Sequence, residues 1–267
     1  MRSIKLLIIV LSCIFISSCI PHKDTIYLQN KENATNDTIP INLTEVQKPY
    51  RIQIDDILNI RIKVLDQDNV QIFNPIGGDA NLNASSAERA YFDGFTVDIH
   101  GNIRIPTLGE LNVLGYTAVE IENKIKTKLL SEQFKETANI FVTVKLAGLR
   151  YTAAGEINNP GTVTLFKERV NIFEAIANAG EIPITGNRKE VMIIRQYPQG
   201  QQIHSLDLTD VDVMKSPYYF IQPNDMIYVK PLKQKSLGTG ETAVASLTTI
   251  ATIVSLITSS VLIFTRL

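Results

Sequence analysis

The chain has 267 residues, enough for one or two domains, and a formal net charge of -1. This near-neutral balance excludes the basic excess that nucleic-acid binding requires. Apolar residues make up 45% of the chain, as in an ordinary globular protein, while Trp is absent and aromatic residues reach only 7%, so no sugar-stacking aromatic cleft is evident.

Residues 1–18 are predicted to be a signal peptide. Arg2 and Lys5 precede an apolar run over residues 6–16, which is too short to span a bilayer comfortably. The run ends in Ile16-Ser17-Ser18-Cys19, which resembles a bacterial lipoprotein signal. Cleavage there would leave Cys19 as an acylated first residue, and its acyl chains would anchor the protein in membrane lipid. A signal anchor with an incidental cysteine is the alternative.

Residues 19–47 are predicted to be a flexible tether. They are rich in Asn, Thr, Lys, Asp and Glu and have no sustained hydrophobic period. Such a segment cannot bury enough apolar surface to fold alone.

Folding signals begin at Tyr50 and predict a first domain over residues 48–147. Apolar alternation on both sides of Asp55-Asp56 predicts a strand, a turn and a second strand within residues 50–62, with Asp56 in the turn. Residues 66–92 are rich in Asn, Gly and Ser and read as a long surface loop.

The middle of this domain combines a predicted hairpin with a helix. Apolar residues alternate over 95–99 and again over 103–105 around a His-Gly-Asn turn, which predicts a hairpin. Thr117 and Glu120 form a capping box before a helix whose buried face is predicted to carry Ala118, Ile121, Ile125 and Leu129. A strand is predicted over residues 140–146.

A second domain is predicted over residues 148–232. Strands are expected over 151–157, 191–195 and 226–229, with a short helix over 172–179 that Asn171 and Glu174 cap and Gly180 ends. Pro160 and Gly161 fit a type II turn, a structural role in which Gly supplies the positive φ. About five strands around one short helix predict a small α+β domain of β-grasp type.

The two domains share a short echo in sequence. The segment Ile52-Gln53-x-x-Asp56-x-Leu58 resembles Ile221-Gln222-x-x-Asp225-x-Ile227. If the echo is more than coincidence, it predicts the same turn chemistry used twice.

The C-terminal region is predicted to be a hinge over residues 233–241 and a transmembrane helix over 242–265. No charged residue occurs from Thr242 to Phe264, and at ~1.5 Å per residue the helix would be about 35 Å long, enough for a ~30 Å hydrocarbon core. The larger apolar residues form one stripe that is predicted to face lipid, comprising Leu247, Ile250, Val254, Ile257, Val261 and Phe264. The hydroxyl residues predicted to line a pore are Thr248, Thr249, Thr252, Ser255 and Ser259.

Two other interpretations of this helix stay open. It is a single span if its hydroxyls bond back to their own helix. It is a tether across the periplasm if it inserts into the inner membrane instead of the outer one.

No motif in the chain points to catalysis. The histidines lie at positions 22, 100 and 204 without metal-ligand spacing, and no nucleophile elbow, phosphate-binding loop or dinucleotide fingerprint occurs. We therefore expect no enzyme activity, no metal and no cofactor.

Two sets of motifs carry a family resemblance. The first domain resembles the polysaccharide biosynthesis/export domain in Tyr50-Arg51-Ile52-x-x-x-Asp56-Ile57-Leu58-x-Ile60 and Val97-Asp98-x-x-Gly101-Asn102-Ile103-x-Ile105-Pro106-x-Leu108-Gly109. The second domain is similar to a soluble-ligand-binding β-grasp (SLBB) domain in Ala154-Gly155-Glu156-Ile157-x-Asn159-Pro160-Gly161 and Gln222-Pro223-x-Asp225-x-Ile227-x-Val229. The family's usual Pro-Gly before the first Asp is replaced here by Ile54-Asp55.

The resemblance implies a lipid-anchored subunit of a homo-oligomeric ring in the outer membrane, with most of its chain in the periplasm. It implies a passive conduit that exports capsular or extracellular polysaccharide. It also implies an inner-membrane partner, a chain-length-determinant or tyrosine-kinase protein, and no nucleic acid. The alternative is a monomeric carbohydrate-binding or envelope-signalling lipoprotein with a membrane tether.

Overall fold

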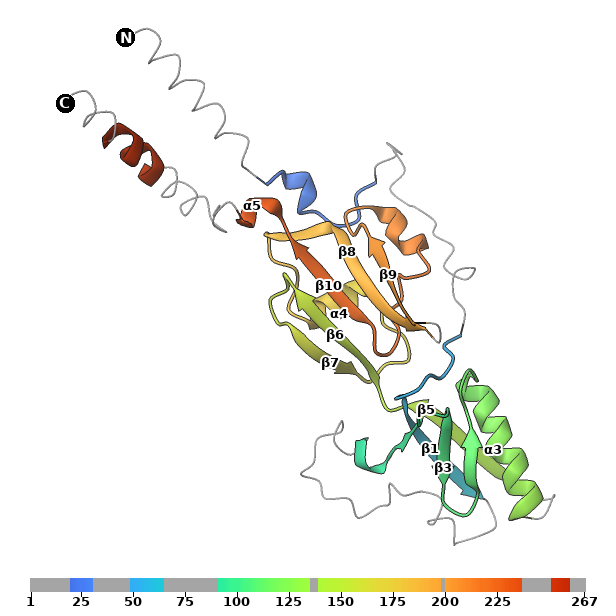
Figure 1. Ribbon diagram of the computed structural model, residues 1–267. Helices are drawn as coiled ribbons and strands as arrows, with labels where there is room; N and C mark the ends of the chain where they lie inside the picture. Colours follow the sequence, from blue (N-terminus) through green and yellow to red (C-terminus); the bar gives the residue numbers. More distant parts are fainter. Residues whose placement is uncertain are drawn as a thin grey trace.

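The computed structural model describes residues 20–30, 49–64, 91–134, 139–197, 200–236 and 251–259 (Figure 1). Buried side chains form two separate hydrophobic cores, one built from residues 52–144 and the other from residues 149–229. Both combine strands with few helices, so the predicted α+β class is confirmed for the two folded domains.

The first domain has two small sheets and one long helix. The three-stranded sheet is antiparallel, in the order β2-β1-β5, and the two-stranded sheet pairs β3 with β4. These elements are β1 (Ile57–Val64), β2 (Phe95–Thr96), β3 (Asn102–Ile105), β4 (Gly109–Asn112), α3 (Ala118–Glu132) and β5 (Ile140–Leu146).

Local sequence signals explain α3 and β5. The Thr117 side chain accepts the Glu120 backbone N–H and the Glu120 carboxylate accepts that of Thr117, so the predicted capping box is present. Ile121, Ile125 and Leu129 are fully buried, as their spacing predicted. The strand predicted over residues 140–146 is β5 itself.

The second domain is a mixed five-stranded sheet with one short helix. Its strand order is β7-β6-β10-β8-β9, and β6 and β10 run parallel while the other pairs are antiparallel. The elements are β6 (Leu149–Gly155), β7 (Gly161–Leu165), α4 (Ile172–Asn178), β8 (Gly186–Tyr197), β9 (Gly200–Leu206), η5 (Val211–Lys215) and β10 (Met226–Pro231).

The short helix follows its sequence signals closely. Asn171 and Glu174 form a complete capping box, and Gly180 follows the helix end with a φ of 84°. The side chains of Ile172, Ala175 and Ile176 are buried in the core of this domain. The predicted start and end of this helix are therefore confirmed.

The predicted hairpin over residues 95–105 is wrong. Its first half, β2, pairs with β1, and its second half, β3, pairs with β4 across a tight turn in which Thr107 has a φ of 65°. The chain does reverse near residue 98, because the Asp98 carboxylate accepts the backbone N–H groups of His100 and Asn102. Ile99 is consequently 76% exposed instead of continuing the buried face.

One further expectation about strands needs correction, and one strand was not among those expected. Residues 50–54 form no strand, although Ile52 is buried and its backbone bonds to Gly115 and Tyr116 on the chain before α3. Strand β9 has no apolar alternation, since its exposed residues include polar Gln201, Gln202 and Ser205 as well as Ile203, which is 63% exposed, and its pairing with β8 defines it. The predicted loop over 66–92 lies outside the described residues except for its last two.

Candidate functional site

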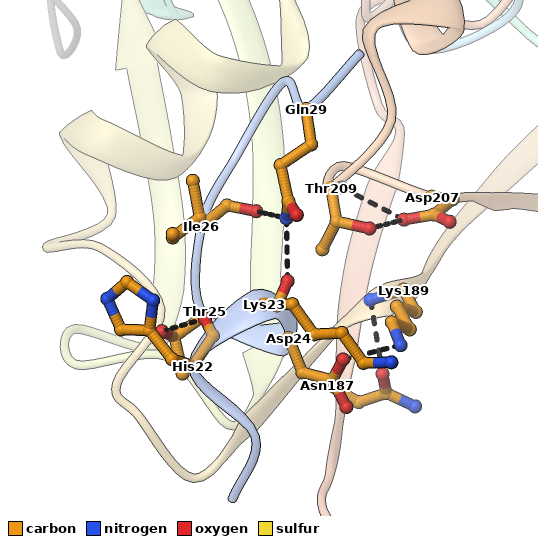
Figure 2. Close-up of polar contacts among 10 residues, drawn as sticks. All are labelled: His22, Lys23, Asp24, Thr25, Ile26, Gln29, Asn187, Lys189, Asp207 and Thr209. Carbon is orange, nitrogen blue, oxygen red and sulfur yellow. Dashed lines mark hydrogen bonds and ion pairs between the residues drawn. The ribbon is translucent and has the colours of Figure 1, made fainter. Parts of the chain in front are cut away.

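The residues immediately after Cys19 form a strap on the second domain. We use the name strap for residues 20–30, which include the short helix η2 (His22–Asp24). Figure 2 shows the polar contacts of its first half. The sequence predicted a flexible tether here, and in the structure residues 20–30 make specific contacts with residues between 173 and 211. Residues 31–48, the rest of the tether, lie outside the described residues.

Backbone pairing holds the C-terminal half of the strap. The Leu28 and Gln29 N–H groups donate to the carbonyls of Leu208 and Thr209 at 3.1 and 2.7 Å, and the Val211 N–H donates back to Gln29 at 3.2 Å. Gln29 forms an isolated parallel bridge with Asp210. The segment therefore adds to the second domain as a short extra strand, a mode that derives its affinity mainly from main-chain hydrogen bonds.

Side chains of the strap complete its fold. The Gln29 amide donates to the carbonyls of Lys23 and Ile26 at 2.6 and 2.8 Å, which closes the chain around η2 (Figure 2). The Asp24 carboxylate lies 2.5 Å from the Lys189 ammonium on β8. This ion pair ties η2 to the beginning of β8.

Tyr27 is the apolar anchor of the strap. Its ring meets Phe173 edge-on at a centroid distance of 5.5 Å, and the Arg188 guanidinium lies 5.1 Å from the ring centroid. Its hydroxyl donates to the Glu181 carboxylate. Burial raises the pKa of Tyr27, and the hydrogen bond to Glu181 raises it further. Arg188 is itself 8% exposed and donates to the Ile182 carbonyl at 2.6 Å.

The chain continues from the second domain into its C-terminal region beside the beginning of β8, where η2 of the strap also binds. At the last residue of β10, Pro231 pairs with Gly186, and the Leu232 N–H donates to the Thr185 carbonyl at 2.8 Å. The helix α5 (Lys233–Ser236) follows at once. Because Asp24 binds Lys189 and Pro231 pairs with Gly186, both segments border the first four residues of β8 (Figure 1).

A partly buried carboxylate secures α5. The Lys235 ammonium lies 2.7 Å from both oxygens of Glu156, and the Thr185 hydroxyl donates to one of them at 2.7 Å. Burial alone would raise the pKa of Glu156, but the hydrogen bonds from Lys235 and Thr185 lower it. The contact fixes where the C-terminal segment departs.

The predicted membrane residues fall mostly outside the described residues. Cys19 does, and so do Leu247, Thr248, Thr249, Ile250, Val261 and Phe264. Residues 251–259 are helical, with Val254 and Ile257 47% and 42% exposed, and they include Thr252, Ser255 and Ser259. Within the described residues no helix has both the length and the apolar character needed to cross a bilayer.

One hydroxyl in this helix bonds back to its own backbone. Thr258 Oγ1 donates to the carbonyls of Val254 and Ser255 at 2.8 and 3.0 Å. Ser and Thr hydroxyls in helices commonly bond in this way to the preceding turn. The assignments of the pore-lining and lipid-facing stripes stay predictions.

The predicted turn at Pro160 and Gly161 differs in detail. Gly161 has the expected positive φ, but its value of 146° is far from the roughly 80° of a type II turn. It is the first residue of β7 and pairs with Ala153. An added Cβ would meet nothing within 4 Å, so any strain in a substitution there comes from the backbone.

Sequence reasoning did not find Tyr27, Glu181 or Arg188. The only local signal was the triplet Ile26-Tyr27-Leu28 in an otherwise polar segment. A strap that bonds to a loop about 180 residues later leaves no periodic pattern of its own.

Comparison with known families matches part of the chain. Residues 44–147 match the family of polysaccharide biosynthesis/export proteins, which covers the first domain. A search of curated proteins found no match. The predicted resemblance is thus confirmed over the first domain, and the SLBB assignment of the second domain stays a prediction.

Proposed function

Because residues 44–147 belong to the polysaccharide biosynthesis/export family, we propose that this chain is a subunit of an oligomeric outer-membrane conduit for capsular or extracellular polysaccharide. The family match is the observation that carries the proposal. The strap adds support, since it gives a lipid-anchored N-terminus a defined place on the folded protein.

The position of the two ends supports insertion into a single membrane. The strap and α5 both border the start of β8, so an acylated Cys19 and a C-terminal span would leave the second domain at one end. The first domain joins the opposite end of the second domain (Figure 1). In this arrangement the β-grasp domain sits next to the outer membrane and the export domain extends into the periplasm.

The mechanism of such a conduit is physical, not chemical. Subunits surround an aqueous lumen, and their polar inner surface spares a hydrophilic polymer the cost of contact with hydrocarbon. Synthesis and inner-membrane partners supply the force. The family resemblance makes the periplasmic end of the export domain the surface that faces a chain-length-determinant or tyrosine-kinase protein.

The first experiment measures the mass of the detergent-extracted, full-length lipoprotein. We expect a closed oligomer of several chains when the particle is measured by light scattering with the detergent contribution subtracted. A monomer at all concentrations would contradict the conduit and favour the second candidate.

The second experiment distinguishes a pore-lining helix from a simple anchor. If Thr252 lines a pore and Val254 faces lipid, Thr252→Cys should react with a membrane-impermeant thiol reagent and Val254→Cys should not. The mature chain has no other free thiol once Cys19 is acylated, so any reaction reports on the introduced cysteine. Equal protection of the two variants would leave an anchor and contradict the pore.

The carbohydrate-binding alternative would need an aromatic ring with a free face. The second domain has an aromatic cluster, but its His204 and Tyr218 rings stack on each other at a centroid distance of 3.7 Å, and the Arg195 guanidinium lies 5.5 Å from the Tyr218 ring centroid. The cluster therefore gives little support to a sugar platform. The mass measurement separates the two functions, since a binding lipoprotein needs no oligomeric ring.

A further inference from the structure

Both domains contain the same Asp-locked turn. In the first, the Gln53 N–H donates to Asp56 Oδ2 at 2.8 Å and the Asp56 N–H donates to the Gln53 carbonyl at 3.3 Å. In the second, the Gln222 N–H donates to Asp225 Oδ2 at 2.7 Å and the Asp225 N–H donates to the Gln222 carbonyl at 3.2 Å. The sequence echo therefore reflects one turn chemistry used twice.

The two turns meet at the boundary between the domains. Each has a left-handed third residue, Asp55 with a φ of 69° and Asn224 with a φ of 64°, a conformation that Asp and Asn tolerate better than most residues. The Asn224 amide of the second turn donates to Asp56 Oδ1 of the first at 3.4 Å. Residues 168 positions apart thus join the domains through a polar contact.

Asp56 is buried at this boundary. It is 3% exposed, and its Oδ2 accepts hydrogen bonds from the Gln53 N–H and, at 2.7 Å, from the Tyr50 hydroxyl. The pKa of Asp56 is raised to about 6, and burial is the main cause. The charge of Asp55 also raises this pKa, whereas the hydrogen bonds from Gln53 and Tyr50 lower it. The Asp56 carboxyl therefore exchanges its proton at a higher pH than an exposed aspartate does.

A buried ion pair also lies at the boundary, and His204 interacts electrostatically with both of its members. Arg195 on β8 binds Asp225 through Nε at 2.9 Å and Nη2 at 2.7 Å, with both side chains at most 5% exposed. Burial raises the pKa of Tyr50, and the charge of Asp56 raises it further. Asp225 adds a smaller increase, and Arg195 lowers the pKa slightly. The Asp56 carboxyl has no such cation among its hydrogen-bond partners in the described chain.

The chain joins the two domains twice, once through residues 31–48 after the strap and once, more directly, between β5 and β6. Only Ala147 and Gly148 separate β5 from β6, and Gly148 has a φ of 134°. A second contact, between Lys145 and Glu168 at 2.9 Å, has both side chains more than half exposed and contributes little. Two linker residues suffice as a hinge, because hinges are a few positions that absorb a change in φ and ψ.

We propose that this junction is a latch that tightens when Asp56 is protonated and loosens when Asp56 is ionised. Opening the junction hydrates the carboxylate, and hydration favours the charged form. The closed state therefore binds the proton more tightly than the open state, and a fall in pH favours closure. Asn224 suits both states, since its amide can donate to a carboxylate or accept from a carboxylic acid. The latch belongs to the two folded domains and does not depend on the export role.

The test measures the distance between the domains in the full-length, detergent-extracted lipoprotein. Spin labels go on two exposed positions, through Lys126→Cys on α3 and Ser205→Cys on β9, and labelled chains are diluted with unlabelled ones. Pulsed electron resonance then gives the distance distribution at two pH values. If the open state restores the ordinary pKa of Asp56, the closed-to-open ratio rises about tenfold between roughly pH 7.5 and pH 5.

Variants identify the group that titrates. Asp56→Asn stays neutral, so its closed-to-open ratio should be the same at both pH values. Asn224→Gly keeps the left-handed turn without the amide and should lower the closed fraction at pH 5. Asp98→Asn changes an exposed turn away from the junction and should behave like the wild type. An unchanged wild-type ratio, or a full pH response in Asp56→Asn, would overturn the latch.

Discussion

The turns at Asp56 and Asp225 share their backbone geometry but differ in electrostatics. Both aspartates are at most 3% exposed and both lock a Gln N–H three residues earlier. Asp225 is paired with Arg195, whereas Asp56 has only the Tyr50 hydroxyl and the Asn224 amide as side-chain partners among the described residues. A short local motif thus sets the shape of each turn, while the neighbours of the turn in space determine how its charge is balanced.

The largest effect is expected from removing the cation of the second turn. Arg195→Ala leaves Asp225 buried without its charge partner, which typically lowers the free energy of unfolding by about 3–5 kcal/mol. Urea unfolding of the variant measures the loss. The matched control is Arg104→Ala, whose ion pair with Glu110 is largely exposed and is worth about 0–1 kcal/mol. Equal losses in the two variants would show that the buried pair does not stabilise the second turn.

A smaller effect is expected from neutralising the first turn. The folded pKa of Asp56, about 6, lies above its ordinary value of 3.8, so its contribution to stability is fully present below about pH 4 and is lost as pH rises through about 6. The change amounts to about 2–3 kcal/mol. Asp56→Asn should lack this slope when unfolding is measured across that range, and Asp98→Asn should retain it. If the unfolding free energy of Asp56→Asn still falls as pH rises over this range, a group other than Asp56 causes the pH dependence.

The smallest effect is expected at the hydroxyl that supports Asp56. Tyr50→Phe removes one hydrogen-bond donor to Oδ2, which should cost about 0.5–1.5 kcal/mol of unfolding free energy. Because the Tyr50 hydrogen bond lowers the pKa of Asp56, its loss should raise that pKa further in an NMR titration. Tyr91→Phe is the control, since Tyr91 is 65% exposed. A lowered pKa in the Tyr50 variant would contradict the assigned contact.

The strap and α4 show a second contrast, in how far each could be predicted. The ends of α4 follow from Asn171, Glu174 and Gly180, because capping groups act within one helical turn. The docking of Tyr27 beside Phe173 and Arg188 depends on a surface assembled from distant parts of the chain. No pattern within residues 20–30 reveals such a surface.

The features that can be predicted from the amino-acid sequence are those with short-range causes. These are the capped helices α3 and α4, the alternating strand β5, and the two Asp-locked turns, since each depends on contacts a few residues apart. Long-range contacts in the folded protein establish the pairing of β3 with β4, the docking of the strap, and the contact of Asn224 with Asp56. Partner choice between distant segments depends on the surfaces that folding brings together, and a linear pattern of apolar and polar residues does not encode that choice.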